Sequence, residues 1–214
     1  MSDVKSWIGP AIGIVFVVLF VVISLLFGDG KDPTDNSAQE VIDFYNDNDD
    51  KQTIAALLVG LASIAALFFG GWLRRVLRDA EGPGDWLSAV AFAGVIVFAA
   101  GAIVSGTIHL ELADYADNTD TIDPAAIQAL NAFEFNFFMF FPVGLGTMLL
   151  ASGLSVIRHG AFPRWVGWLG LASGILFVTP AFFVGFVLVP LWILIVSIIG
   201  ISRARAGGAA PTAA

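Results

Sequence analysis

The sequence predicts an all-α protein, a bundle of six transmembrane helices with both the N-terminus and the C-terminus in the cytoplasm. The first observation is composition: 57% of the 214 residues are hydrophobic and 13% are charged, whereas a soluble domain is about a quarter charged. The second is that long segments contain no Asp, Glu, Lys or Arg, and each can cross a hydrocarbon core of about 30 Å. These segments are 8–27, 54–73, 87–108, 137–157 and 166–201. The third is that arginine and tryptophan gather at turns on one side of the predicted bundle, and acidic residues on the other.

The first span is expected at about 7–27, and a polar, acidic segment follows it. The apolar run is too long for a signal peptide and has no small-residue cleavage site after it, so we expect a retained helix. Ser37 and Glu40 in the acidic segment form a capping-box pattern. A short helix should therefore begin after Ser37, with an apolar side made of Val41, Ile42, Phe44 and Tyr45.

The second and third spans, about 53–73 and 86–108, are joined by a turn with three arginines. Arg74, Arg75 and Arg78 precede a Gly-Pro-Gly sequence, and a tryptophan stands on each side of the turn. Arginine stays on the cytoplasmic side of a membrane and tryptophan favours the headgroup level. The turn is therefore expected to face the cytoplasm.

The arginine turn also offers a surface to anionic lipid or to a cytosolic partner. Three acidic residues of the same turn, Asp79, Glu81 and Asp85, partly neutralise its arginines. This neutralisation favours the simpler interpretation, in which the arginines only set the topology.

A second acidic loop leads to the fourth span, expected at about 136–157. Asp123 followed by Pro124 is typical of a helix N-cap with proline at the first helical position. The helix that begins there is expected to continue to Arg158, with a bend near Pro142. Arg158 and Arg164 then form a second basic turn.

The last two spans are expected at about 165–181 and 186–202, with the turn between Pro180 and Val187. Each arm has about 17 residues, which is the lower limit for crossing a bilayer.

The spans together predict a single transmembrane domain over 1–206 and a disordered tail, rich in Gly and Ala, over 207–214. Six crossings with the N-terminus inside place every arginine on the cytoplasmic side and most acidic residues outside. The charge distribution therefore agrees with the positive-inside rule.

Three stretches of the chain resemble a group of uncharacterised multi-pass membrane proteins of high-GC bacteria. They are Val41-Ile42-Asp43-Phe44-Tyr45, the turn over 79–84 with the start of the third span at 87–94, and 162–170. Pro190-Leu191-Trp192 fits the same group. The resemblance covers about 38–202. It implies a topology and brings no substrate or catalytic residue.

His109, at the end of the third span, and Glu134, before the fourth, form the candidate polar site. Both are expected at the same depth near the outer interface, with Asn131 and Asn136 nearby. A short loop joins the two spans, which favours adjacent antiparallel helices, so we expect the two side chains within hydrogen-bond or one-water reach. Ionisable groups at a membrane edge can mark a proton or ion site. The alternative is a solvated rim group or a structural hydrogen bond.

The residue types present predict neither a cofactor nor a metal centre. The chain has no cysteine, which excludes thiolate ligands. Its two histidines, His109 and His159, are expected on opposite sides of the membrane, which excludes a haem pair between them. Acidic residues recur every third position in the second outer loop, but without the order of an EF-hand. A solvated loop is therefore favoured over a cation site at Asp114, Asp117, Asp120 and Asp123.

The sequence predicts a non-enzymatic structural or interaction component of the plasma (inner) membrane. No charged residue lies at a span centre and no catalytic set converges. Membrane lipids are the expected partners, a protein partner or homo-oligomer is left open, and a net charge of −8 is a poor fit to nucleic acid. The alternative is a small transporter or channel component with its polar site at the outer ends of spans three and four. An enzyme acting on lipid is the third reading, served by the same His109 and Glu134.

Overall fold

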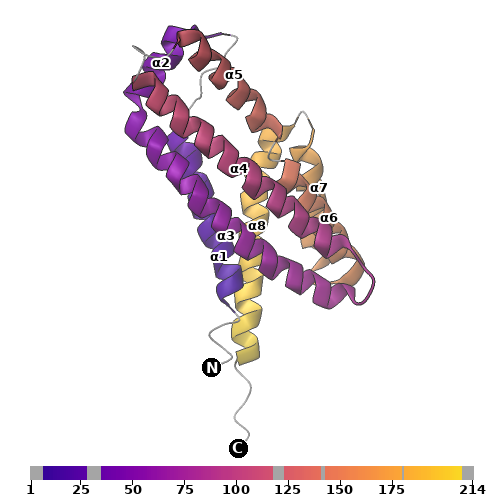
Figure 1. Cartoon of the computed structure of the whole chain (residues 1–214). Helices are drawn as coiled ribbons and strands as arrows, with labels where there is room; N and C mark the ends of the chain where they lie inside the picture. The colour runs from indigo at the N-terminus through magenta and orange to yellow at the C-terminus, as the bar shows by residue number, and fades with distance from the viewer. Residues whose placement is uncertain (1–6, 28–34, 118–122, 141–142, 180, 209–214) are drawn as a thin grey trace, which may run out of the picture. The chain divides into compact units, whose positions relative to one another are not determined.

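A computed structural model describes residues 7–27, 35–117, 123–140, 143–179 and 181–208, and these residues form eight α-helices without a strand (Figure 1). Four of the helices are long and apolar enough to cross a membrane: α1 (Ile8–Phe27), α3 (Asp49–Glu81), α4 (Leu87–Asp117) and α8 (Phe182–Gly208). The other four are α2 (Ala38–Asp47), α5 (Pro124–Phe140), α6 (Val143–His159) and α7 (Arg164–Phe177). The protein is therefore all-helical and fits a membrane-embedded chain, as the sequence predicts. The count of six crossings and the cytoplasmic termini stay predictions.

The helix predicted to run through the fourth span is described as two segments, α5 and α6, on either side of residues 141–142. α5 ends at Phe140 and α6 begins at Val143, and residues 141–142 lie outside the described part of the chain. α6 has 17 residues and covers about 25 Å at 1.5 Å per residue. The bend predicted near Pro142 falls on residues outside the described part of the chain.

The last hairpin differs from the expected boundaries. α7 ends at Phe177, so it has 14 residues and covers about 21 Å, less than the hydrocarbon core of about 30 Å. α8 begins at Phe182 and continues through Pro190 to Gly208. Proline is tolerated inside a membrane helix because neighbouring groups satisfy the freed backbone atoms. The turn therefore lies before the expected position, residues 207 and 208 are helical, and the rest of the predicted tail lies outside the described residues.

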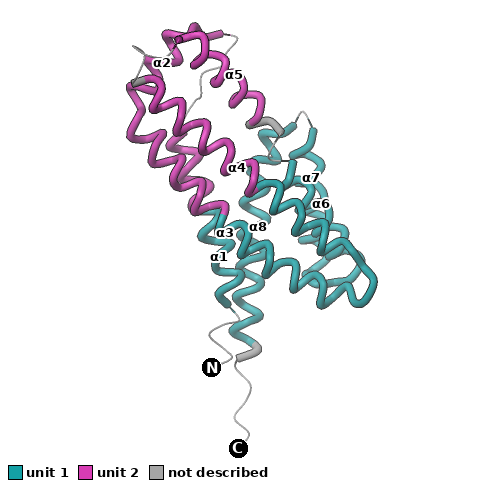
Figure 2. Tube along the Cα trace, in the orientation of Figure 1, with its two compact units in different colours: residues 1–18, 64–98, 143–214 teal, residues 19–63, 99–142 magenta. Residues whose placement is uncertain are grey.

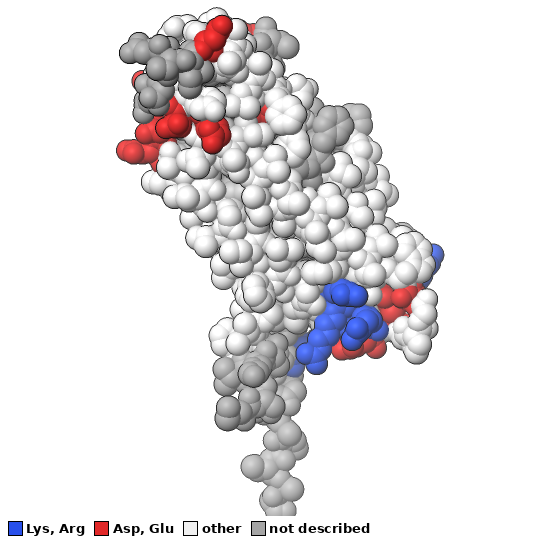
Figure 3. Space-filling model, viewed as in Figure 1, with Lys and Arg blue, Asp and Glu red and all other residues white. Residues whose placement is uncertain are grey.

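The chain divides into two compact units, and helices α1, α3 and α4 contribute to both (Figure 2). Unit 1 comprises 1–18, 64–98 and 143–214, and unit 2 comprises 19–63 and 99–142. The arginines of the α3–α4 turn belong to unit 1. The acidic residues of α2, of the start of α3 and of the end of α4 belong to unit 2. Figure 3 colours the basic residues blue and the acidic residues red.

Unit 1 is packed through glycines that allow close approach of helices. A Cβ added to Gly94 of α4 would lie 2.5 Å from the carbonyl oxygen of Gly144 in α6. In the same unit, a Cβ on Gly13 of α1 would collide with Ser197 of α8. Trp192 of α8 is fully buried and its indole Nε1 donates to the Val166 carbonyl of α7 at 2.9 Å. Small residues at such crossings are typical of membrane helices, where packing drives association.

Unit 2 carries a small apolar core in which α2 packs on α4 and α5. The Ser37 hydroxyl accepts from the Glu40 backbone, and the Glu40 carboxylate accepts from the Ser37 backbone, so the predicted capping box is present. The expected apolar side of α2 faces the core, with Phe44 partly buried. The buried core residues are Val41, Ile42, Tyr45, Ile108, Leu112, Ala113, Ala116 and Ile127.

Candidate functional site

Helices α4 and α5 bring the two predicted site residues together inside unit 2. His109 Nε2 lies 3.1 Å from Glu134 Oε1, and both side chains are about 10% exposed. α5 begins where the sequence predicts, because Asp123 Oδ1 accepts from the Ala125 backbone at 2.9 Å and Pro124 is the first helical residue. The matching depth inferred from the helix lengths therefore gave the correct pairing of these two side chains.

Ser105 completes the contacts of Glu134 on the α4 side. Its hydroxyl donates to Glu134 Oε1 at 3.1 Å. Ser105 and His109 are four residues apart on α4, so they lie on one helix face and reach the same carboxylate oxygen. This spacing was present in the sequence and was the signal that could have added Ser105 to the site.

The two asparagines of the predicted site take different positions on α5. Asn131 is buried one turn before Glu134, with 3% of its surface exposed. Asn136 is exposed, and its amide donates to the Ala132 carbonyl of its own helix at 2.8 Å. Asn131 therefore shares the buried region of α5 with Glu134, whereas Asn136 does not join the site.

Two aromatic residues that the sequence reasoning did not assign to the site contact the His109 ring. Phe27, the last residue of α1, stacks on the imidazole with a centroid distance of 4.0 Å and an interplanar angle of 13°. The Tyr45 hydroxyl of α2 lies 3.4 Å from His109 Nδ1. Tyr45 belongs to one of the motifs of the family resemblance, but no local pattern links it to a residue 64 positions away.

The hydrogen bonds of this cluster are complete with a neutral imidazole that carries its proton on Nε2. Burial raises the pKa of Tyr45 above its ordinary value, and the Glu134 carboxylate raises it further, so the phenol keeps its proton. In that tautomer Nδ1 would accept from the phenol and Nε2 would donate to the Glu134 carboxylate, whereas a ring with a proton on Nδ1 would donate to the phenol oxygen. A neutral imidazole has one donor and one acceptor nitrogen, which fits these two partners.

A second histidine–carboxylate pair lies in unit 1, at the α3–α4 turn. His159, the last residue of α6, has Nε2 2.7 Å from Asp85 Oδ2. The pKa of Asp85 is lowered, first by the hydrogen bond from the Trp86 backbone, then by that of Leu87 and by His159, while burial opposes them. The sequence reasoning placed His159 in a basic turn and assigned it no partner.

Glu81 also contacts α6 and the start of α4. Its Oε1 accepts from the Ser155 hydroxyl at 2.5 Å, and its Oε2 accepts from the Ser88 backbone at 3.2 Å. Among the three acids expected to neutralise the arginine turn, only Asp79 pairs with an arginine in the described structure, and that contact, to Arg75, is 3.9 Å long and exposed. Glu81 and Asp85 contact α4 and α6, and neither forms an ion pair with an arginine among the described residues.

The five arginines predicted to set the topology are all exposed on unit 1: Arg74, Arg75, Arg78, Arg158 and Arg164. The Arg74 guanidinium lies 5.6 Å from the centre of the Phe92 ring. Arg74, Arg78, Arg158 and Arg164 have no carboxylate partner among the described residues.

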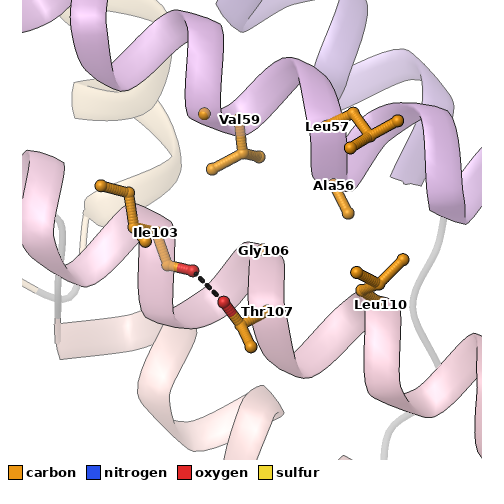
Figure 4. Close-up of a pocket in the computed structure, with 8 residues that line it drawn as sticks. Ala56, Leu57, Val59, Ile103, Gly106, Thr107 and Leu110 are labelled. Atoms are coloured by element: carbon orange, nitrogen blue, oxygen red, sulfur yellow. Dashed lines mark hydrogen bonds between the residues drawn. The ribbon is translucent and has the colours of Figure 1, made fainter.

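A groove of about 120 Å³ runs between α3 and α4 in unit 2 (Figure 4). Val59, Gly106, Leu57 and Leu110 are among its lining residues, and a Cβ added to Gly106 would lie 3.2 Å from the Val59 side chain. The one hydroxyl among its lining residues, on Thr107, donates to the Ile103 carbonyl of its own helix at 2.9 Å. The groove is therefore apolar and presents no free polar group.

The described residues contain no group of three His, Cys, Asp or Glu side chains that could hold a metal ion. Asp120 lies outside them, so the repeated aspartates of the second outer loop are not described as a set. The imidazole, carboxylate and phenol of the His109 cluster are groups that form hydrogen bonds and can share protons.

No curated protein and no solved structure matches the chain. A protein-family model does match, over residues 11–204, which is nearly the whole length. The match agrees with the resemblance to an uncharacterised family, and the chain belongs to the family defined by the domain of unknown function DUF4386.

Proposed function

We propose that this protein is a non-enzymatic, multi-pass component of the plasma membrane that binds anionic lipid headgroups at the arginine surface of unit 1. We define the arginine surface as Arg74, Arg75, Arg78, Arg158 and Arg164. The observation that carries the proposal is the position of the nearby carboxylates. Glu81 and Asp85 contact α4 and α6 instead of the arginines.

The positive charge of these exposed arginines suits a membrane surface that carries phosphate groups. Exposed guanidinium groups attract anionic lipids, and each Lys or Arg near the surface contributes about 1 kcal/mol. Exposed tryptophans accompany the arginines, with 61% of Trp86, 55% of Trp165 and 62% of Trp168 exposed. Tryptophan is enriched at the headgroup level of membranes, so both residue types favour the same depth and the same partner.

A non-enzymatic role is supported by the contacts of the buried polar groups, which bind one another across helices. His109, Glu134 and Ser105 join α4 to α5. Glu81 and Ser155 join the end of α3 to α6. Such contacts stabilise helix packing, and the apolar α3–α4 groove offers no polar path beside them.

The test compares lipid retention by purified protein in native mass spectrometry. The wild type should retain phosphatidylglycerol in preference to phosphatidylcholine. Replacement of Arg74, Arg75 and Arg78 by Gln should weaken that retention by up to about 100-fold, from about 1 kcal/mol for each residue. The Lys51→Gln variant, which removes a cation from unit 2, is the control and should retain the lipid.

A variant with Lys at the same three positions keeps the positive charge that sets the topology. It should retain phosphatidylglycerol better than the Gln variant, because Lys also binds phosphate, as a point charge. Equal retention of both lipids by the wild type, or full retention by the Gln variant, would contradict the proposal.

The transporter alternative is tested separately, in liposomes with a pH gradient. If the protein does not transport protons, the pH gradient should decay at the same rate in liposomes with and without the protein. A faster decay that disappears in His109→Gln would replace the present proposal with the transporter reading.

A further inference from the structure

The turn between α7 and α8 in unit 1 differs in composition from the other turns predicted on the outer side. The segments 28–50 and 111–123 are rich in acidic residues. Between Arg164 and Arg203, in contrast, the chain contains no Asp, Glu, Lys, Arg, His, Asn or Gln. Thr179 is the one polar side chain among the described residues of this turn. The turn therefore offers water no charged group.

The surface of this turn is apolar and exposed. We define the aromatic tip as Phe177, Val178, Phe182, Phe183 and Val184, and residue 180 lies outside the described part of the chain. The Phe182 ring lies 4.9 Å from that of Phe177 and 5.8 Å from that of Phe183. The exposed fractions are 81% for Phe183, 53% for Val184 and 46% for Val178. Apolar surface of this kind is favoured in hydrocarbon and disfavoured in water.

The backbone groups of the turn bond to one another. The Thr179 backbone N–H and hydroxyl both donate to the Leu176 carbonyl, at 3.3 Å and 3.0 Å. The Phe182 N–H donates to the Thr179 carbonyl at 3.0 Å, and the Val184 N–H donates to the Ala181 carbonyl at 2.9 Å. A segment at membrane depth finds no water to bond, so its polar backbone groups need partners within the protein. These hydrogen bonds meet that requirement.

The length of α7 places the aromatic tip short of the far side of a bilayer. Trp168 is exposed near the start of α7 and favours the headgroup level. From Trp168 to Phe177, α7 rises about 14 Å. A Cβ added to Gly185 would lie 2.5 Å from the Phe177 Cα, so Gly185 is level with Phe177, and residues 181–185 add about 6 Å beyond it. The tip therefore stands about 20 Å from Trp168, whereas the hydrocarbon core is about 30 Å thick.

The greater length of α8 lies at its other end. The Arg203 guanidinium donates to the Ala161 carbonyl at 2.6 Å and lies 5.2 Å from the centre of the Phe162 ring. Ala161 and Phe162 precede α7, in the turn that carries Arg158 and Arg164. The last turns of α8 therefore extend past the start of α7 and add nothing to the depth of the tip.

We propose that α7 and α8 form a re-entrant hairpin, which enters the membrane from the side of the basic α6–α7 turn and returns to the same side. The aromatic tip ends in the hydrocarbon and contacts the acyl chains of the far leaflet instead of water. The two helices then add no complete crossing, and the end of α8 stays on the side of the α6–α7 turn. This proposal does not rest on lipid binding by the arginine surface, because the tip and Arg164 lie at opposite ends of α7.

The chain has no cysteine, so a single introduced cysteine can carry a nitroxide label at one known position. The labelled full-length protein is placed in dioleoylphosphatidylcholine liposomes with a neutral, water-soluble nickel chelate on both sides. Electron paramagnetic resonance then compares collisions of the label with oxygen, which concentrates in hydrocarbon, and with nickel. Phe183→Cys should collide mainly with oxygen and should report a depth up to about 10 Å inside the far boundary. Ala80→Cys, exposed in the α3–α4 turn of the same unit, is the water reference and should collide mainly with nickel.

Val187→Cys is the matched control within the hairpin. Val187 is 67% exposed and lies one helical turn from Phe183 on the same face of α8. In dioleoylphosphatidylcholine, both labels should be shielded from nickel. In dimyristoylphosphatidylcholine, which forms a thinner hydrocarbon core, nickel collisions should rise at Phe183→Cys and stay low at Val187→Cys.

Two results would overturn the proposal. Nickel collisions at Phe183→Cys as frequent as at Ala80→Cys in the thicker bilayer would mean that the tip reaches water and that the bilayer thins to meet it. Equal nickel collisions at Phe183→Cys in the two lipids would also contradict it, because a hairpin of fixed length comes nearer to the far surface of a thinner bilayer. Both replaced side chains are mostly exposed, so the buried packing of unit 1 stays in place in these variants.

Discussion

The crossing of α4 and α6 in unit 1 depends on two glycines, and Gly94→Ala tests it. A Cβ at position 94 would lie 2.5 Å from the Gly144 carbonyl oxygen and 2.7 Å from the Met148 backbone nitrogen. Ordinary van der Waals contacts of a Cβ begin at 3.4 Å. Both opposing atoms belong to backbone, so no side chain can rotate away, and the helices must separate by roughly 1 Å.

This separation should lower the free energy of unfolding by about 1–3 kcal/mol, which is the usual cost of overpacking a close-packed interior. Separation also removes the other contacts along the crossing, and Gly144 faces α4 just as closely, at 2.5 Å from the Phe98 backbone nitrogen. Alanine has a better helix propensity than glycine by about 1 kcal/mol. This gain reduces the observed destabilisation without reversing it.

Gly71→Ala is the matched control, because Gly71 lies inside α3 and a Cβ there meets no atom within 4 Å. The same chemical change should be neutral or stabilising by up to about 1 kcal/mol at that position. The helix-propensity gain is common to both variants, so their free energies of unfolding should differ by the overpacking cost of about 1–3 kcal/mol. Unfolding by SDS in mixed micelles, followed by circular dichroism, measures this difference. Equal stability of the two variants would show that α4 and α6 do not cross at Gly94.

Three further predictions concern the turn of unit 1 and the topology. The folded protein lowers the pKa of Asp85, so the ionised carboxylate stabilises the fold above the ordinary aspartate pKa, and this stabilisation is lost as the pH falls through the folded pKa. Asp85→Asn should therefore lower the thermal unfolding temperature at pH 7. The unfolding temperature of the variant should also fall less than that of the wild type between pH 7 and pH 3. An impermeant thiol reagent should label Asp123→Cys in whole cells and should leave Ala80→Cys unlabelled, and the reverse pattern would invert the orientation. A reporter fused after Ala206 should be active in the cytoplasm, and an external signal would require an odd number of crossings.

Local sequence patterns were sufficient to predict the helix starts that depend on contacts between neighbouring residues. Ser37 and Glu40 predict the start of α2, and Asp123 with Pro124 predicts the start of α5, because a capping residue bonds to backbone within three positions. The pairing of His109 and Glu134 needed one further step, the equal depth of two antiparallel helices joined by a short loop.

The rest of the site depends on contacts that no local pattern contains. Phe27 stacks on His109 from the end of another helix, and nothing in the spacing of the chain relates the two. The pairing of Asp85 with His159 was missed because charge counting assigns an acid to the nearest arginines, whereas geometry gives it to α6. The last turn was placed too late because the sequence analysis let the fifth span continue to Pro180, whereas α7 already ends at Phe177 and α8 begins at Phe182.

The close contact between Gly13 of α1 and Ser197 of α8 has a consequence for biogenesis. α1 leaves the ribosome well before α8, which carries this partner. At about 5–20 residues per second, the ribosome needs on the order of 10–40 s to pass from Gly13 to Ser197. During that interval the notch at Gly13 faces lipid or the insertion machinery, and the N-terminal segment of unit 1 cannot take its final place. A chain cut short before α8 would leave the space at Gly13 without the Ser197 side chain that fills it in the complete fold.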